Sequence, residues 1–384
     1  MMKMNRTILG IERIDEYKEV FENKRVGLIT NPTGVLADFT PSVDFLLKKV
    51  NLAALYAPEH GLRASIQAGM HVDTYIDPIT NLPVYSMYGR NKRPSKEILD
   101  CIDVLAIDIQ DCGSRYYTFI YTMAYSMMAC KEFGKTFVVF DRPNPINCEK
   151  VEGNILDTKY RSFVGYYPIP QRHGMTIGEL ALLFNKEYGI NCDLVVIPMA
   201  NYERWMSFED THLPWVIPTP NLPKIDTAYV YNTTCVFEGT NVAEGRGTTT
   251  PFELIGAPWL NSEKLAEELN NYKLEGVYFR PQYFTPTFSK YQGELCGGVF
   301  VHITNRDKFD SMKASWTMLE HIRRNYQEFK VNPPYKVGAY SLFDYEVGCD
   351  YMRDMSKSLD EEIEILKEDQ EKFKNIRKPY LLYA

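Results

Sequence analysis

The sequence lacks the short motifs on which several large enzyme classes depend. Neither Gly-x-Gly-x-x-Gly nor Gly-x-x-x-x-Gly-Lys-Ser/Thr occurs, so the usual phosphate cradles of dinucleotide and nucleoside-triphosphate enzymes are missing. There is no His-Glu-x-x-His motif, the six His are widely spaced, and no Gly-x-Ser-x-Gly elbow is present. Metal and cofactor catalysis, and a serine nucleophile on such an elbow, therefore have no local support.

The sequence is also poor in paired cysteines, in basic patches and in long apolar runs. Its eight Cys include no Cys-x-x-Cys pair, a pattern that favours a reducing compartment over a disulfide framework. A net charge of −7 and no basic stripe predict neither a nucleic-acid partner nor an anionic membrane surface. No run approaches the ~20 apolar residues of a membrane helix, and no signal peptide is visible, so we expect a cytoplasmic protein. Export with a leader removed is the alternative.

Short apolar runs alternate with helical patterns through the first half of the chain. The runs 25–29, 52–56, 104–107, 136–140 and 194–197 read as strands, and the segments between them carry helical spacing. This alternation predicts an α/β fold with a mostly parallel sheet. With 384 residues we expect two domains, divided just after the proline-rich stretch 214–223. The second half mixes extended runs with helices, as in an α+β domain.

Polar side chains follow four of these expected strands. Parallel strands place their carboxyl ends at one edge of a sheet, which is where open α/β sheets bind ligands. One polar turn is commonly a solvated turn, whereas four at the same edge favour a site. The residues concerned are Asn31, Glu59, His60, Asp108, Gln110, Asp111, Asp141, Arg142 and Asn144.

Two further polar turns lie outside the expected strands. The stretch 237–253 contains three Gly, with Glu238, Asn241 and Arg246 beside them, and reads equally well as a structural loop or as one wall of a ligand cleft. His173 lies in the turn 171–174, where a hydrogen-bonded structural His is the commoner outcome.

The remaining chemistry is acid–base catalysis by carboxylates and His, flanked by Arg, Asn, Gln and Tyr. Hydrolysis of a glycosidic bond needs such a set, because a carboxylic acid protonates the leaving oxygen while a second group stabilises the cationic centre. Cys112 offers a thiol alternative, although a buried inert Cys is the more frequent reading.

The motifs are specific enough, taken together, to indicate a family. The chain resembles the NamZ-type exo-β-N-acetylmuramidases, a glycoside hydrolase family long filed as a domain of unknown function. The matching stretches run in order over most of the chain: GLITNPTGV (27–35), LYAPEHGLRA (55–64), DIQDCGSRYYTFIYTM (108–123), DRPNPI (141–146), VEGNIL (151–156), PIPQRHGMTIGELA (168–181), TPNLP (219–223), EGTNVAEGRGTTTPFE (238–253) and GAPW (256–259).

The resemblance implies a Rossmann-like N-terminal domain (1–228), a smaller α+β C-terminal domain (229–384) and a cleft between them. It implies release of N-acetylmuramic acid from the non-reducing end of peptidoglycan fragments without a cofactor or a metal. The family's proposed catalytic glutamate falls on Glu59. Other family motifs contain His60, Asp111, Arg115, Tyr116, His173, Glu238, Asn241 and Arg246. Cys148, Asn154 and Ala243 depart from the usual pattern, but none of them replaces an acid, a base or an Arg.

On this basis we expect Glu59 to be the general acid/base, with His60 or a carboxylate of the 108–111 turn tuning its proton. Arg115 and Arg246 are the candidates for binding the lactyl carboxylate of N-acetylmuramic acid. Retaining, inverting and substrate-assisted mechanisms all stay open. The alternatives are an amidase acting on muropeptides and a non-catalytic amino-sugar-binding protein, in either case a monomer or a homodimer.

Overall fold

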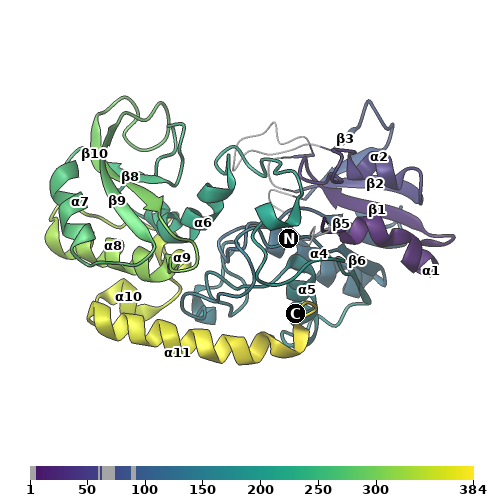
Figure 1. Cartoon of the computed structure of the whole chain (residues 1–384). Coiled ribbons are helices and arrows are strands. Elements are labelled where there is room, and N and C mark those ends of the chain that lie inside the picture. Colours follow the sequence, from purple (N-terminus) through teal and green to yellow (C-terminus); the bar gives the residue numbers. More distant parts are fainter. Residues whose placement is uncertain (1–5, 59–60, 63–73, 88–91) are drawn as a thin grey trace.

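The computed structural model describes residues 6–58, 61–62, 74–87 and 92–384, and within them the chain forms two sheets (Figure 1). The larger sheet has the order β3-β4-β2-β1-β5-β6-β7, and every neighbouring pair except β3–β4 is parallel. Its strands are β1 (Arg25–Thr30), β2 (Asn51–Ala57), β3 (Tyr75–Ile76), β4 (Pro83–Ser86), β5 (Val104–Asp108), β6 (Thr136–Phe140) and β7 (Leu194–Ile197). The α/β expectation is confirmed, whereas the β3–β4 edge was not predicted.

The strands of this sheet are apolar on both faces because helices cover both sides. Ile29, Tyr56 and Ile107 face α4 (Phe119–Phe133) and α5 (Ile177–Lys186) in the largest apolar cluster. Leu28 and Leu55 face the opposite side, where η1 (Gly10–Tyr17) and α2 (Ser42–Leu46) pack. Burial on both faces is the property of parallel sheets that turns their strands into continuous hydrophobic runs.

Helix ends in this part follow local chemistry. Thr176 accepts a hydrogen bond from the Glu179 backbone while the Glu179 side chain accepts one from the Thr176 backbone, which forms a capping box. Helix α4 begins at Phe119, after a turn at residues 115–116. The remaining short helices here are α1 (Lys18–Phe21), α3 (Lys96–Leu99), η2 (Thr158–Tyr160) and η3 (Glu209–Thr211).

The second part of the chain is built on a three-stranded antiparallel sheet of order β8-β10-β9. Trp316 and Phe279 lie in its separate apolar core. Helix α6 connects the two parts in Figure 1, and the division expected at 228/229 falls inside this helix. The elements are α6 (Ile225–Thr234), η4 (Cys235–Gly239), β8 (Leu254–Ala257), α7 (Ser262–Asn270), β9 (Val277–Phe284), β10 (Cys296–Ile303), α8 (Ser311–Asn325), α9 (Leu342–Val347) and α10 (Asp350–Asp354).

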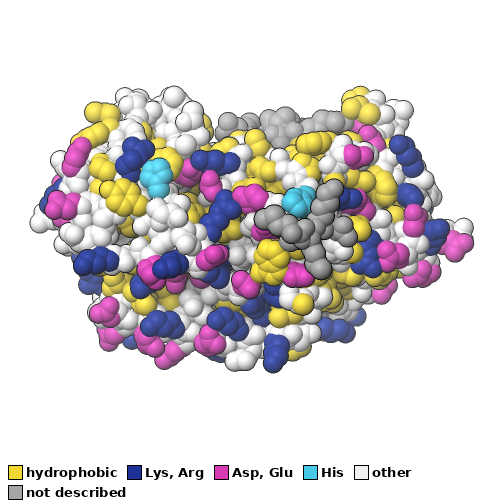
Figure 2. Space-filling model, in the orientation of Figure 1, with side chains coloured by type: hydrophobic (Ala, Val, Ile, Leu, Met, Phe, Trp, Pro, Cys, Tyr) yellow, Lys and Arg dark blue, Asp and Glu magenta, His cyan; other side chains and the backbone are white. Residues whose placement is uncertain are grey.

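The last helix returns the chain to the first part. Helix α11 (Leu359–Arg377) runs beneath both parts in Figure 1, followed by η5 (Lys378–Tyr380). Its outer face carries alternating Lys and Glu, paired as Glu364–Lys367 at 2.8 Å and Glu371–Lys374 at 2.6 Å. Figure 2 shows the same mixture of positive and negative side chains along this lower surface. The solvated helix face expected for 361–374 is thus confirmed.

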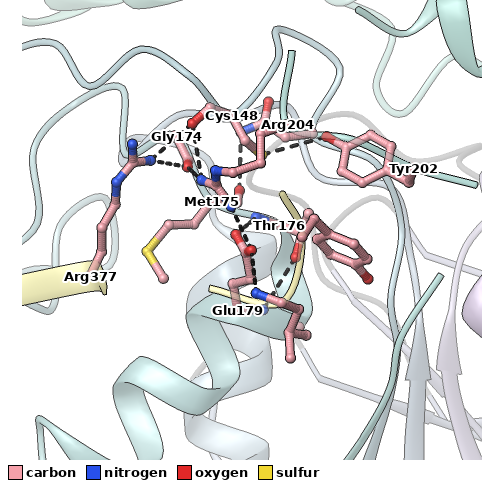
Figure 3. Close-up of polar contacts among 12 residues, drawn as sticks. Cys148, Gly174, Met175, Thr176, Glu179, Tyr202, Arg204 and Arg377 are labelled. Atoms are coloured by element: carbon pink, nitrogen blue, oxygen red, sulfur yellow. Dashed lines mark hydrogen bonds and ion pairs between the residues drawn. The ribbon is translucent and has the colours of Figure 1, made fainter. Parts of the chain in front are cut away.

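Residues 377–384 bind the first part through a polar network that we call the C-terminal latch (Figure 3). Glu179 Oε1 accepts hydrogen bonds from the Leu382 backbone (2.9 Å) and from Arg204 (2.6 Å). The Tyr383 hydroxyl donates to Asp141 at 2.5 Å, and Arg377 donates to the carbonyls of Cys148 and Gly174. The end of the chain therefore packs on the first part, although it follows the second part in sequence.

Among the helices of the described ranges, none has both the length and the apolar character needed to cross a membrane.

Candidate active site

The polar residues expected at the carboxyl ends of β1 and β5 do converge, and most of them bind one another. Asp108 is fully buried, and its carboxylate accepts hydrogen bonds from Arg142 Nε at 2.6 Å and Nη2 at 2.8 Å, and one from Ser42. Buried ion pairs are stable only when their remaining hydrogen bonds are made, and this one is complete. Asp108 therefore ties α2, β5 and the turn after β6 together.

Asn31 and Gln110 belong to the same rim. Asn31 Oδ1 accepts hydrogen bonds from the Thr33 backbone (2.9 Å) and hydroxyl (2.6 Å), and the Gln110 backbone donates to that hydroxyl at 2.9 Å. The Gln110 side chain donates to the carbonyls of Pro143 and Asp111. Asn31 Nδ2, in contrast, has no hydrogen-bond partner among the described residues and lines a cavity of about 390 Å³ beside β1 and β2.

Asp111 and His173 form a buried pair behind this rim. His173 Nε2 lies 3.7 Å from Asp111 Oδ2, and the Gly113 backbone donates to the same oxygen at 2.8 Å. His173 Nδ1 accepts a hydrogen bond from the Met175 backbone, which places the proton of a neutral ring on Nε2, toward the carboxylate. Asp111 Oδ1 has no partner within the described part of the chain.

A second cavity, of about 150 Å³, lies between the two parts of the molecule, and we call it the interdomain cavity. The turn after β5, the 219–222 segment, α6 and the 238–252 stretch all contribute to its wall. Three of the residues expected from sequence, Tyr116, Glu238 and Arg246, line it together. The full lining is Tyr116, Tyr117, Thr118, Phe119, Val164, Thr219, Asn221, Leu222, Tyr231, Glu238, Arg246 and Phe252.

Two charged side chains of the second part face this cavity. Arg246 forms an ion pair with Glu238 and a second one, from Nε to Glu244 Oε1, at 2.7 Å. Lys290 binds the other oxygen of Glu244 at 2.9 Å. Burial raises the pKa of the Glu238 carboxyl, and the neighbouring Arg246 opposes that rise.

Glycines on either side of Arg246 shape the backbone that presents it. Gly245 and Gly247 have φ values of +76° and +84°, which L side chains rarely adopt. A Cβ on Gly247 would lie 2.4 Å from the Phe288 carbonyl oxygen. The glycine pattern of the 238–253 stretch therefore has a structural cause that also fixes the position of Arg246.

Aromatic rings form the opposite wall of the cavity. Tyr231 contacts Tyr117 edge-on at 6.2 Å and Phe252 edge-on at 4.7 Å between ring centroids. Sequence reasoning missed Tyr231, because α6 carries no motif and its residues are brought to the cavity only by the fold. A mixed wall of aromatic faces and charged groups suits a ligand with both apolar and hydrogen-bonding surfaces, as sugars have.

Glu346 is a further buried acid that the sequence did not indicate. It lies on α9, and its Oε2 accepts a hydrogen bond from the Gly239 backbone at 3.3 Å. The Cys235 thiol lies 4.0 Å from both Glu346 Oε1 and Glu238 Oε1. Burial raises the pKa of Glu346 well above its ordinary value, and the nearby Glu238 adds to that rise. No local pattern around residue 346 could have shown this.

Two residues expected to bind substrate lie away from the cavity wall. Arg115 is fully buried, and its guanidinium donates to the carbonyls of Asn154 (2.9 Å), Ile169 (3.1 Å) and Glu346 (2.7 Å). The Asn241 side chain donates to the Glu328 carbonyl and accepts from the Lys330 backbone. These contacts give Arg115 and Asn241 structural positions, which leaves Arg246 as the guanidinium at the cavity.

Glu59 and His60 lie outside the described residues. On either side of them, Gly61 N donates a hydrogen bond to Pro58 O at 3.0 Å. Gly61 has a φ of +78°, a left-handed conformation that favours glycine.

Cys112, the thiol alternative, is fully buried. Burial raises the pKa of this thiol well above its usual range, so it is protonated at neutral pH. Among the residues that the structure describes, no cluster of three or more His, Cys, Asp or Glu could hold a metal ion.

A mostly parallel α/β sheet, a smaller antiparallel sheet, and a cavity lined by an acid, a guanidinium and aromatic rings are compatible with an enzyme of the glycoside hydrolase class. Comparison with known families then identifies the group. The model described as "Exo-beta-N-acetylmuramidase NamZ, N-terminal" matches residues 26–226, and its C-terminal counterpart matches residues 229–383. The chain belongs to the NamZ family of exo-β-N-acetylmuramidases.

Individual relatives agree with this assignment. The peptidoglycan beta-N-acetylmuramidase NamZ of Bacillus subtilis (strain 168) is 48% identical over 380 residues, covering 97% of this chain and 91% of that protein. Two crystal structures of DUF1343 family proteins from Bacteroides fragilis NCTC 9343 are similar over 99% of both chains. Their TM-scores are 0.88 and 0.77, at 36% and 34% sequence identity.

Proposed function

We propose that this protein hydrolyses the β-glycosidic bond of N-acetylmuramic acid at the non-reducing end of peptidoglycan fragments. The observation that carries the proposal is the interdomain cavity, where the Glu238–Arg246 ion pair faces the rings of Tyr117, Tyr231 and Phe252. The 48% identity to a named peptidoglycan beta-N-acetylmuramidase supports the same substrate class.

The lactyl carboxylate separates N-acetylmuramic acid from other amino sugars, and Arg246 is our candidate for binding it. A guanidinium can hold a carboxylate through two parallel hydrogen bonds. Arg246 shares its charge between Glu238 and Glu244, and Glu244 keeps Lys290 as a second cation. Arg246 can therefore turn toward a substrate carboxylate without leaving Glu244 unpaired.

Glu59 remains our candidate general acid/base. Support comes from the position of Pro58 directly after β2, at the same sheet edge as the loops that follow β1 and β5. Glu238 would accept a hydrogen bond from a sugar hydroxyl and orient Arg246. The separation of the two carboxyl groups would decide between retaining and inverting hydrolysis.

The direct test is hydrolysis of a chromogenic β-glycoside of N-acetylmuramic acid, with the released sugar identified by mass spectrometry. Glu59→Gln should lower kcat by several orders of magnitude, because the amide cannot protonate the leaving oxygen. Glu238→Gln should raise KM more than it lowers kcat. Absence of turnover in the unmodified protein would contradict the proposed activity. If Glu238→Gln lowered kcat more than Glu59→Gln does, the catalytic acid would be Glu238 instead.

A further inference from the structure

A third hollow lies beside the turn 162–165, which places Val164 in the wall of the interdomain cavity. The turn is closed by two hydrogen bonds, from Ser162 N to Gly165 O at 2.7 Å and from Gly165 N to Ser162 O at 3.4 Å. Val164, near its tip, lines the interdomain cavity, whereas Arg161 and Tyr166, on its two legs, line the other hollow. Val164 and Tyr166 are two residues apart in the chain, so the linings of the two hollows meet at this turn.

This hollow, which we call the aromatic trough, is open to solvent and has a volume of about 260 Å³. Tyr166 contacts Tyr167 edge-on at 5.0 Å, and Tyr167 stacks on Tyr188 at 4.9 Å with an angle of 12° between the rings. The Tyr188 hydroxyl donates to the Pro168 carbonyl at 2.9 Å, which holds that ring in place. The remaining lining residues are Met128, Thr158 and Pro168.

Arg161 supplies a positive charge at the rim of the trough. Its side chain is exposed, and its guanidinium carbon lies 4.7 Å from the centre of the Tyr166 ring. Within the described residues, the guanidinium has no ion-pair or hydrogen-bond partner. Stacking on the ring orients the guanidinium plane while its N–H groups stay free for an anion.

We propose that the aromatic trough binds the part of the glycan on the reducing side of the cleaved bond, with Arg161 contacting a lactyl carboxylate of that chain. In an alternating chain that begins with N-acetylmuramic acid in the interdomain cavity, the next lactyl carboxylate belongs to the third sugar. Tyr167 is buried and stacked on Tyr188, so the half-buried Tyr166 and Tyr188 offer the apolar surface to a sugar ring. The free guanidinium of Arg161 complements the carboxylate. This inference rests on the proposed function, because the interdomain cavity must hold the terminal sugar.

The test compares a short and a long substrate in the full-length protein. Arg161→Ala should raise KM about tenfold for a peptide-free tetrasaccharide with a non-reducing terminal N-acetylmuramic acid, as expected for one charged hydrogen-bonding contact. Its kcat, and its turnover of the chromogenic monosaccharide glycoside, should not change. Arg161→Lys keeps the charge but loses the paired donors, so its KM should lie between those of the unmodified protein and Arg161→Ala.

Arg280→Ala is the matched control, because Arg280 is also an exposed arginine over an aromatic ring, 5.5 Å from the centre of Phe300, and lines neither hollow. It should leave both substrates unaffected. An equal KM for the tetrasaccharide in Arg161→Ala and in the unmodified protein would overturn the proposal. So would an effect seen only with peptide-bearing fragments, which would assign Arg161 to the stem peptide.

Binding of the same tetrasaccharide, measured by calorimetry, separates this proposal from the proposed function. If the unmodified protein releases no sugar, the proposed function fails, and the trough is judged by affinity alone. A tenfold weaker affinity in Arg161→Ala would still support the trough, and an unchanged affinity would overturn it.

Discussion

The molecule contains two buried clusters of carboxylates and guanidinium groups, the C-terminal latch and the group around Glu238 and Arg246 at the interdomain cavity. In the latch, Glu179 accepts from Arg204, Leu382 N and Thr176 N, and Arg204 also donates to two backbone carbonyls. Next to Glu238, and outside the cavity lining, the Glu346 carboxyl has one backbone donor at 3.3 Å and a thiol at 4.0 Å among the described residues.

The difference separates a structural network from a candidate binding site. A buried polar group with few partners is unfavourable, and proteins keep such groups mainly where a ligand or a reaction uses them. The carboxylates of the latch are satisfied by hydrogen bonds from the protein itself, and no latch residue lines the interdomain cavity. The group around Glu238 and Arg246 borders an open space and has the sparsely bonded Glu346 beside it, so the density of polar residues alone would not have distinguished the two.

The largest expected effect is a loss of stability when the latch is disrupted, and it tests this contrast directly. Arg204→Met should lower the free energy of unfolding by about 3–5 kcal/mol, because Glu179 stays buried without a cation. Turnover per folded molecule should stay unchanged, because Arg204 does not line the interdomain cavity. Urea denaturation measures the first quantity and an active-site-normalised rate the second.

Lys367 provides the control for this substitution. It pairs with Glu364 at 2.8 Å at the surface, where the two side chains are 62% and 63% exposed. Lys367→Met should therefore change the unfolding free energy by less than about 1 kcal/mol. Similar losses in both variants would remove the distinction between the latch and an ordinary surface pair.

At the cavity, the corresponding change should affect catalysis instead. Arg246→Lys should lower kcat/KM for muramic acid glycosides about 100-fold, or ~2.7 kcal/mol, because a lysine cannot hold a carboxylate through two parallel bonds. Arg115→Lys is the comparison, since it breaks contacts to three buried carbonyls and should act mainly on stability. A stability loss without a catalytic loss in Arg246→Lys would make the cavity a second structural network.

The pH dependence of the latch gives a further test, in which the effect per pH unit is smaller. Burial raises the pKa of Asp141 to about 7, although Tyr383, Gly178 and Thr176 donate hydrogen bonds that oppose the rise. In the unfolded chain this carboxyl titrates near its ordinary pKa of 3.8. Between these values the folded state holds the proton that the unfolded state has released, so this group makes stability fall as pH rises.

The contribution amounts to at most ~1.4 kcal/mol per pH unit between about pH 4 and pH 7. Asp141→Asn should remove it, so the difference in unfolding free energy between this variant and the unmodified protein should change across that range. Urea denaturation at several pH values provides the measurement. Parallel curves for the two proteins would show that Asp141 does not titrate differently on folding.

The smallest effect is expected at Glu346. Burial raises its pKa well above the ordinary value and so favours the neutral carboxyl, and Glu346→Gln replaces that carboxyl by a neutral amide of similar shape. Unfolding free energy at pH 7 should change by less than about 1 kcal/mol, consistent with the small net worth of a neutral hydrogen bond. Glu152→Gln, which disrupts a buried ion pair with Arg172 at 2.9 Å, should be far more damaging.

Strands β1, β2, β5, β6 and β7 were predictable from sequence, because each is a continuous apolar run, as in strands of parallel sheets. The runs 136–140 and 194–197 coincide with β6 and β7. Strands β3 and β4 were missed, since they are short, partly or fully exposed, and carry no such run. Helix α6 was missed because it is buried on all sides and has no amphipathic pattern.

By itself, the sequence determined the family, the alternation of strands and helices, and the set of polar residues from which a site could be built. Only the tertiary structure decided which members of that set reach a cavity. Arg115 and Arg246 are both arginines in polar, glycine-containing turns, yet one is enclosed by backbone carbonyls and the other faces an open space. Burial and partner choice depend on segments hundreds of residues away, such as α9 and the chain end, and no local pattern contains that information.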